Sequence, residues 1–369
     1  MRQIGLGLLV ARSNRLPLFY RVYPGNMHDS RFFNSIMDEM FGVICGFHNT
    51  KQRLTVVFDK GMNAEKNFAW IDDHNRIHFI TNYSTYFSED LVQVPLERFE
   101  VVSTDKNRDL LNNDQADDCL LSYRTRGDYW GKERTVIVTY NPASARKQCY
   151  TFDNKLDVLR KELLVMRKKI REDDPHWRDQ KKVYERYFRL CERLHISSDF
   201  YSLKISKRKN TISMAFTRNM YLVEKKRQSF GKNIIITDNT DWSTEQIITA
   251  NLDRWEVEDR FRLSKNNDLV AVNPLRHWTD SKIRCHLFSC VISLTYLRRI
   301  ELRLLRAGAK RTAVEVMEDM NNLHSVLFLS DGRSKPKRKL EEPSKTQSEV
   351  LTAFGYKIDG SGVLHSVTG

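Results

Sequence analysis

The feature that most constrains the fold is a nearly unbroken apolar run that ends in an acid, from Leu54 to Asp59. Such a run is typical of a strand buried on both faces of a sheet, whose carboxyl end delivers a side chain to a site. The surrounding sequence predicts a hairpin over 3–11 and 17–23, a helix from Asp29 or Ser30 to Gly42, a helix over 63–75 and a strand over 77–81. This order, β-β-α-β-α-β, predicts an α/β fold.

The pattern changes between residues 84 and 232. Short alternating strands are predicted near 120–141, followed by an antiparallel helical hairpin over 155–195, whose apolar residues recur at steps of three and four. From Ser202 to Lys232 the chain has nine Lys or Arg and one Glu, mixed with aromatic residues. This basic segment either tracks a DNA backbone or is a solvated strand face, and the sequence does not decide between them.

The last third predicts a strand over 233–237, two long helices over 243–266 and 279–307, and a flexible tail over 331–369 with a short ordered piece at 347–356. The longest apolar stretch, 286–297, is too short to cross a bilayer. Six cysteines lie without metal-ligand or disulfide spacing, and no secretory signal is visible, so we expect a reducing cytoplasm and no membrane partner.

The charge balance favours a polyanionic partner. Lys and Arg number 61 against 47 Asp and Glu, a formal charge of +14 with a pI of about 9.4. A basic protein of this kind binds nucleic acid through phosphate contacts and counterion release. Nucleic acid is therefore the partner that the composition favours over a merely basic protein.

Charged residues also recur along the helix predicted over 243–266. Its start resembles a capping box formed by Ser243 and Gln246, which sets the register. Steps of three and four then predict one face that carries the following residues: Asn251, Arg254, Glu258, Phe261 and Lys265. An acid opposite Asp59 could bind a divalent metal while the two bases hold phosphates; the alternative is a helix surface with ordinary ion pairs.

This face resembles the Tyr-x2-Arg-x3-Glu-x6-Lys signature of bacterial insertion-sequence transposases. The match holds at Arg254, Glu258 and Lys265, whereas Asn251 stands where the family has Tyr. Other similar pieces occur in the family's order, and together they span about residues 3–300: Leu16–Tyr20 with Pro24–Asp29, Val57–Met62, Arg254–Trp255 through Phe261–Arg262, Pro274, and His277–Trp278.

The resemblance implies a ribonuclease-H-like mixed sheet flanked by helices, with a β-rich and helical-hairpin insertion. The core would comprise 1–83 and 233–330, and the insertion 84–232. Asp59 resembles the second and Glu258 the third catalytic acid, both ligands of two Mg²⁺ or Mn²⁺ ions. Arg254, Lys265 and Asn251 would contact DNA. The implied partners are transposon terminal inverted repeats and target DNA, with self-association in the DNA complex.

The family's first acid is expected on a strand before Gln3, so the resemblance implies a chain truncated at its N terminus. Asp29 follows a Pro-Gly-Asn turn and is interpreted as a helix cap rather than a metal ligand. The absent strand would lie between those at 3–11 and 54–59. Two alternatives stay open at this point: a catalytically dead DNA-binding remnant, and a ribonuclease-H-like nuclease.

Overall fold

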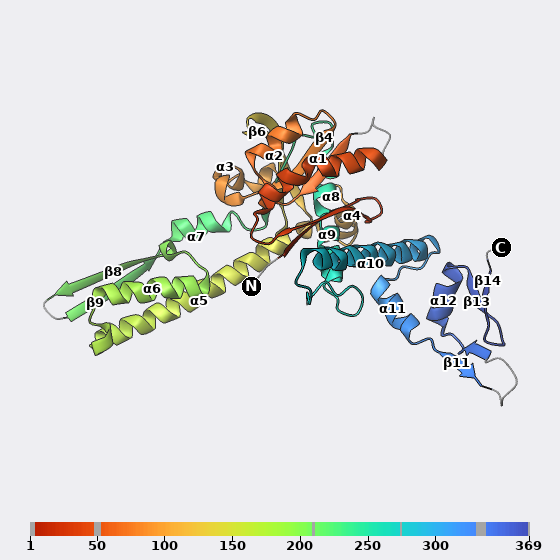
Figure 1. Cartoon of the computed structure of the whole chain (residues 1–369). Helices are drawn as coiled ribbons and strands as arrows, with labels where there is room; N and C mark the ends of the chain where they lie inside the picture. The colour runs from red at the N-terminus through yellow and green to blue at the C-terminus, as the bar shows by residue number, and fades with distance from the viewer. Residues whose placement is uncertain (1–3, 48–52, 209–210, 274, 330–336, 368–369) are drawn as a thin grey trace. The chain divides into compact units, whose positions relative to one another are not determined.

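The computed structural model describes residues 4–47, 53–208, 211–273, 275–329 and 337–367 (Figure 1). The chain divides into two units. Unit 1 contains Met1–Gln52 and Leu252–Gly369, and unit 2 contains Arg53–Asn251. None of the described helices combines the length and the apolar character needed to span a membrane.

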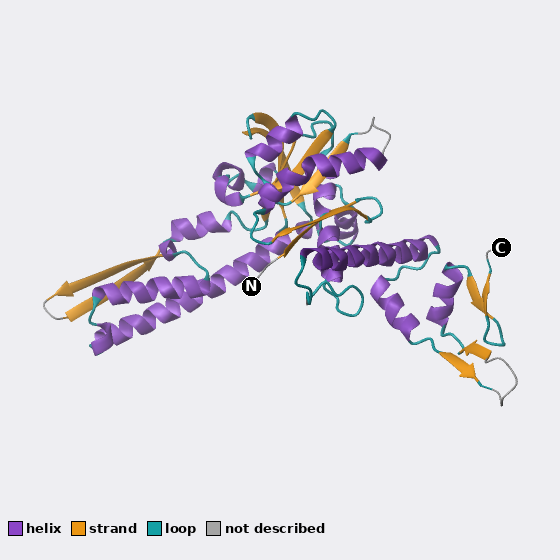
Figure 2. Ribbon diagram, viewed as in Figure 1, coloured by secondary structure: helices purple, strands orange, loops and turns teal. Residues whose placement is uncertain are grey.

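A six-stranded mixed sheet organises unit 2, in the order β3-β4-β10-β7-β6-β5 (Figure 2). β3 (Leu54–Phe58) and β4 (Ile77–Tyr83) are parallel, as expected of two strands joined by a helix. The other neighbours are antiparallel: β10 (Lys232–Thr237), β7 (Lys132–Tyr140), β6 (Leu121–Tyr129) and β5 (Glu100–Val101). The predicted α/β class with a mixed sheet flanked by helices is confirmed.

Helices cover both faces of this sheet. On one face Phe68 of α2 (Glu65–Asp72) packs against Phe79 of β4, with ring centroids 4.8 Å apart. On the other face Ile247 and Ile248 of α8 (Thr244–Leu252) join the cluster around Ile80. The remaining elements of this part are short: η1 (Lys60–Met62), η2 (Thr85–Phe87), α3 (Glu89–Val92), η3 (Leu96–Arg98), α4 (Asp105–Asn112) and η4 (Ala116–Asp118).

Residues 142–230 of unit 2 form a module that we call the arm. It contains α5 (Pro142–Arg171), η5 (Pro175–Trp177), α6 (Gln180–Leu194), η6 (Ser198–Phe200), β8 (Tyr201–Arg208), β9 (Thr211–Arg218) and α7 (Met220–Arg227). Figure 1 shows α5 and α6 alongside the β8–β9 ribbon, and a shared apolar cluster joins them. The predicted helical hairpin is confirmed, and its heptad-like leucines, such as Leu156, Leu159 and Leu163, are buried.

Unit 1 begins with the predicted hairpin, β1 (Ile4–Val10) paired with β2 (Pro17–Pro24). Among the described residues β1 pairs with β2 alone, and in unit 2 β3 pairs with β4 alone. The helices of unit 1 are α1 (Asp29–Phe47), α9 (Trp255–Ser264), α10 (Asp280–Arg306), α11 (Ala313–Asn321) and α12 (Lys345–Ala353). Asp29 lies in the first turn of α1, where its carboxylate accepts a hydrogen bond from the Tyr23 hydroxyl at 2.9 Å.

Two local predictions differ from the structure. The helix expected over 243–266 is two helices, α8 and α9, separated at Asp253 and Arg254. The segment 331–369, expected to be a flexible tail, contains α12, which covers most of the ordered piece expected at 347–356, and the hairpin of β13 (Tyr356–Ile358) with β14 (Leu364–Ser366). It also contains β12 (Lys337–Leu340), which pairs with the preceding β11 (Ser325–Phe328). A capping box that joins Ser344 to Gln347 begins α12, which explains its order.

Candidate functional site

Asp59 lies immediately after β3, as the sequence predicts. It caps the short helix η1: its Oδ1 accepts a hydrogen bond from the Lys60 N–H at 2.8 Å, and its side chain is exposed. Because β3 and β4 are parallel, their carboxyl ends meet at one edge of the sheet, which is where open α/β sheets bind ligands. Asp59 therefore presents a carboxylate at the usual ligand-binding edge.

Three asparagines surround the same ends of the strands and were not predicted. The Asn63 amide donates to the Asn82 carbonyl at 2.9 Å, and the Thr81 hydroxyl donates to Asn63 Oδ1 at 2.8 Å. Asn233, at the start of antiparallel β10, donates to Asn82 Oδ1 at 3.1 Å. Since Phe58 pairs with Thr81, Asp59 and Asn82 are the next residues along each strand. The Asp59 carboxylate and two amide oxygens, each of which already accepts one hydrogen bond, therefore lie at these strand ends, and oxygen is the ligand atom that Mg²⁺ prefers.

The predicted charged face is divided between the two units. Asn251 belongs to α8, where its side chain is 8% exposed and Oδ1 has no hydrogen-bond partner among the described residues. Arg254 caps the start of α9, Glu258 lies one turn further, and Lys265 caps the end. The expectation of one continuous face from Asn251 is therefore corrected, although the capping box of Ser243 and Gln246 is confirmed.

The break coincides with a tertiary contact. Backbone bonds of the tighter i to i+3 type join Glu256 N–H to the Asp253 carbonyl and Val257 N–H to the Arg254 carbonyl, both at 3.0 Å. Arg12, in the turn after β1, forms an ion pair with Asp253 at 2.6 Å. No Gly or Pro interrupts this stretch, so the sequence contains no local signal for the break.

On α9 itself Arg254 and Glu258 share one face. The Arg254 Nη2 to Glu258 Oε1 distance is 3.9 Å, and the Glu258 side chain is 71% exposed. An ion pair at this distance is weak when water can reach one of its charges, as it does at Glu258. The Glu258 carboxylate is therefore accessible to outside ligands.

The opposite face of α9 is fixed to the rest of unit 1. Buried Glu256 forms an ion pair with Arg15 at 2.5 Å, and burial raises the pKa of Glu256 despite the attraction of Arg15. Arg260, whose side chain is 4% exposed, contacts Glu301 of α10 at 3.5 Å. These contacts hold α9 so that Glu258 points to solvent.

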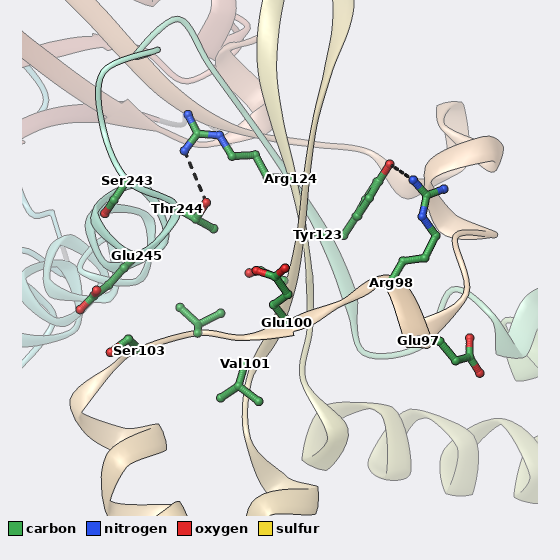
Figure 3. Close-up of a pocket in the computed structure, with 12 residues that line it drawn as sticks. Glu97, Arg98, Glu100, Val101, Ser103, Tyr123, Arg124, Ser243, Thr244 and Glu245 are labelled. Carbon is green, nitrogen blue, oxygen red and sulfur yellow. Dashed lines mark hydrogen bonds between the residues drawn. The ribbon is translucent and has the colours of Figure 1, made fainter.

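A separate open pocket of about 640 Å³ lies at the other edge of the unit 2 sheet, between β5, β6 and the start of α8 (Figure 3). Its arginines are already engaged: Arg98 donates to the Tyr123 hydroxyl at 2.9 Å, and Arg124 donates to the Trp242 carbonyl at 2.9 Å. Glu97, Glu100 and Glu245 add negative charge. The pocket is a poor fit for a phosphate and is remote from β3.

Within the described ranges no group of three or more His, Cys, Asp or Glu is arranged to hold a metal ion. No family model matches the chain, and no curated protein matches it either.

Proposed function

We propose that the chain is the catalytic region of an insertion-sequence transposase with a ribonuclease-H-like core. It would cut transposon ends and join the 3′-hydroxyl to target DNA. The observation that carries the proposal is Asp59 at the carboxyl end of a parallel strand pair, with the Arg254, Glu258 and Lys265 spacing on a later helix.

Asp59 and Glu258 are the residues that would hold the Mg²⁺ or Mn²⁺ ions. The donor chemistry fits, since both carboxylates are exposed and Asp59 stands beside amide oxygens. Two such ions, when bound, would supply Lewis-acid activation of an attacking water or 3′-hydroxyl and stabilisation of the leaving oxygen, so that one phosphorus–oxygen bond would form as the other breaks.

The bases of α9 would bind the DNA strand. Arg254 and Lys265 flank Glu258, and a guanidinium or ammonium group binds phosphate oxygens through charge-assisted hydrogen bonds. The proposal assigns no direct DNA contact to Asn251 because its side chain is buried. As part of the same proposal the protein self-associates on DNA in a bacterial cytoplasm.

The test is Mg²⁺-dependent strand cleavage of a terminal inverted repeat. It is measured on the full chain with a duplex that carries the repeat, with and without Mg²⁺. Glu258→Gln should abolish any cleavage, whereas Glu318→Gln, an exposed acid of α11, should leave it unchanged. If cleavage survives Glu258→Gln, the assignment of the third acid is wrong.

The second candidate is a DNA-binding protein without chemistry, and the concentration of positive charge in the arm favours it. It predicts salt-dependent DNA binding with no cleavage in Mg²⁺ or Mn²⁺.

A further inference from the structure

The positive charge of the chain is concentrated in the arm. Residues 142–230 contain 23 Lys and Arg against 11 Asp and Glu, and so carry +12 of the chain's formal +14. The other 280 residues contain 38 basic and 36 acidic side chains, and are nearly neutral. The arm is therefore the part of the chain that attracts a polyanion most strongly.

Most acids of the arm are already neutralised. Six of them form ion pairs with arm cations: Asp153, Glu162, Glu172, Asp173, Asp174 and Glu224. Many arm cations form no ion pair with a residue in the described part of the chain. Lys204 on β8 is exposed and forms no salt bridge with any residue that the structure describes. The uncompensated charge is thus free to bind an external anion.

The β8–β9 ribbon has two different faces. Tyr201, Ile205, Ile212 and Met214 are buried in the apolar cluster with α5 and α6. Among the residues whose side chains the structure describes, the outer face carries short side chains and one lysine, in three cross-strand pairs: Ser202 with Thr217, Lys204 with Ala215, and Ser206 with Ser213. All six are exposed, and the two serine hydroxyls of the last pair are 2.7 Å apart.

The dimensions and chemistry of this face match one partner. A ribbon of eight-residue strands is roughly 26 Å long, since a strand rises about 3.3 Å per residue. The major groove of B-DNA is about 12 Å wide and admits a two-stranded ribbon. Short side chains let the backbone approach closely, hydroxyl groups bind base edges or phosphates, and a lysine neutralises phosphate.

We propose that the outer face of the β8–β9 ribbon docks into the major groove of duplex DNA, with Lys204 on a phosphate. The inference rests on the proposed function for the choice of DNA, and it adds a binding surface that is separate from Asp59 and Glu258. Helices α5 and α6 support the ribbon from behind through the apolar cluster.

The test measures binding of the full chain to a short duplex by fluorescence anisotropy in EDTA, where no cleavage occurs. Lys204→Glu should weaken binding by about tenfold and lower the salt slope by about one or more. The matched control is Lys161→Glu, an equal charge change on α5. Lys161 is exposed and lies two residues from buried Leu159 and Leu163, on the opposite side of the helix. It should weaken binding by less than about twofold.

A second variant separates the effect of shape from the effect of net charge. Ala215→Trp places a bulky ring at the centre of the outer face without changing the net charge, and should weaken binding through the loss of close approach. Thermal unfolding of each variant checks that the arm is folded. Equal losses in Lys204→Glu and Lys161→Glu would overturn the ribbon assignment, because only net charge would then matter. Tighter binding to duplex RNA or single-stranded DNA would overturn the choice of partner.

The two proposals fail separately. If the chain binds DNA through the ribbon but never cleaves it, the proposed catalytic function is contradicted and the ribbon assignment stands. If Lys204→Glu and Ala215→Trp bind like the original chain while cleavage is observed, the reverse holds.

Discussion

Charged side chains have opposite surroundings around α9 and in the arm. On the inner face of α9 two ion pairs are buried: the Arg260 and Arg298 side chains are 4% and 10% exposed, and both contact Glu301. On the outer face of the β8–β9 ribbon, Lys204 is exposed and unpaired among the described residues. Basic side chains thus hold a helix in place in unit 1, whereas in the arm they are accessible to a partner.

The difference follows from the cost of removing charge from water. A buried ion loses its hydration, and only a partner with good geometry offsets that loss. An exposed lysine keeps its hydration and contributes little to folding. The buried ion pairs of α9 should therefore contribute to the free energy of unfolding. The exposed lysine of the ribbon should instead contribute to DNA binding.

The largest expected effect comes from Glu301→Ala. The Glu301 carboxylate contacts Arg298 at 2.8 Å and Arg260 at 3.5 Å, so the variant leaves two buried guanidinium groups without this partner. We expect a loss of about 3–5 kcal/mol in the free energy of unfolding of unit 1, measured by urea denaturation. Lys204→Ala is the contrasting variant and should change the free energy of unfolding by less than about 0.5 kcal/mol. Similar values for both would remove the distinction.

The next largest effect is expected in the arm, whose described part is stabilised by apolar packing and not by buried ion pairs. Leu159 of α5 is fully buried in the apolar cluster that α5 shares with the ribbon, whereas Leu164 of the same helix is 39% exposed. Leu159→Ala should lower the free energy of unfolding by roughly 2–4 kcal/mol, because it removes buried methylene groups and leaves a cavity. The chemically identical Leu164→Ala should cost less than about 1 kcal/mol, since it removes partly hydrated surface. Circular dichroism during denaturation separates the two.

The smallest effect is a pH dependence at Glu256. Burial raises the pKa of Glu256 above its ordinary value of 4.5, because the loss of hydration exceeds the attraction of Arg15. The folded state therefore binds the proton more tightly than the unfolded state. This contribution to stability is complete below 4.5 and is lost as pH rises through the folded pKa.

Glu256→Gln has no such titration and provides the reference. The unfolding free energy of the original chain, relative to Glu256→Gln, should increase as pH falls from neutral toward 4.5. An increase with rising pH would mean that the Arg15 pair outweighs the burial of the carboxylate.

Much of the fold could be predicted because it depends on local periodicity. The apolar run before Asp59 predicts β3, the alternation near residues 120–141 predicts β6 and β7, and the leucine spacing from Leu156 predicts the hairpin of α5 and α6. Each element shows the hydrophobic repeat of its own secondary structure, so its local sequence is sufficient to predict it. Asp59 and Glu258 could be placed on their elements for the same reason.

What could not be predicted depends on contacts between distant residues. The break between α8 and α9 coincides with an ion pair from Asp253 to Arg12, 241 residues away. The asparagines beside Asp59 come together only through strand pairing, because Asn233 and Asn82 are 151 residues apart. The hydroxyl-rich outer face of the ribbon could not be predicted either, because its position depends on which side of the ribbon packs against α5.

The central claim is that Asp59 and Glu258 hold the same metal ions, and Mn²⁺ binding to the full chain tests it most directly. Calorimetric titration should be made on the original chain, on Asp59→Asn, on Glu258→Gln and on the double variant. Each single change should weaken binding, and the double change should cost less than the sum of the two, because both ligands serve one site. Losses that add independently, or no loss in Glu258→Gln, would contradict the account.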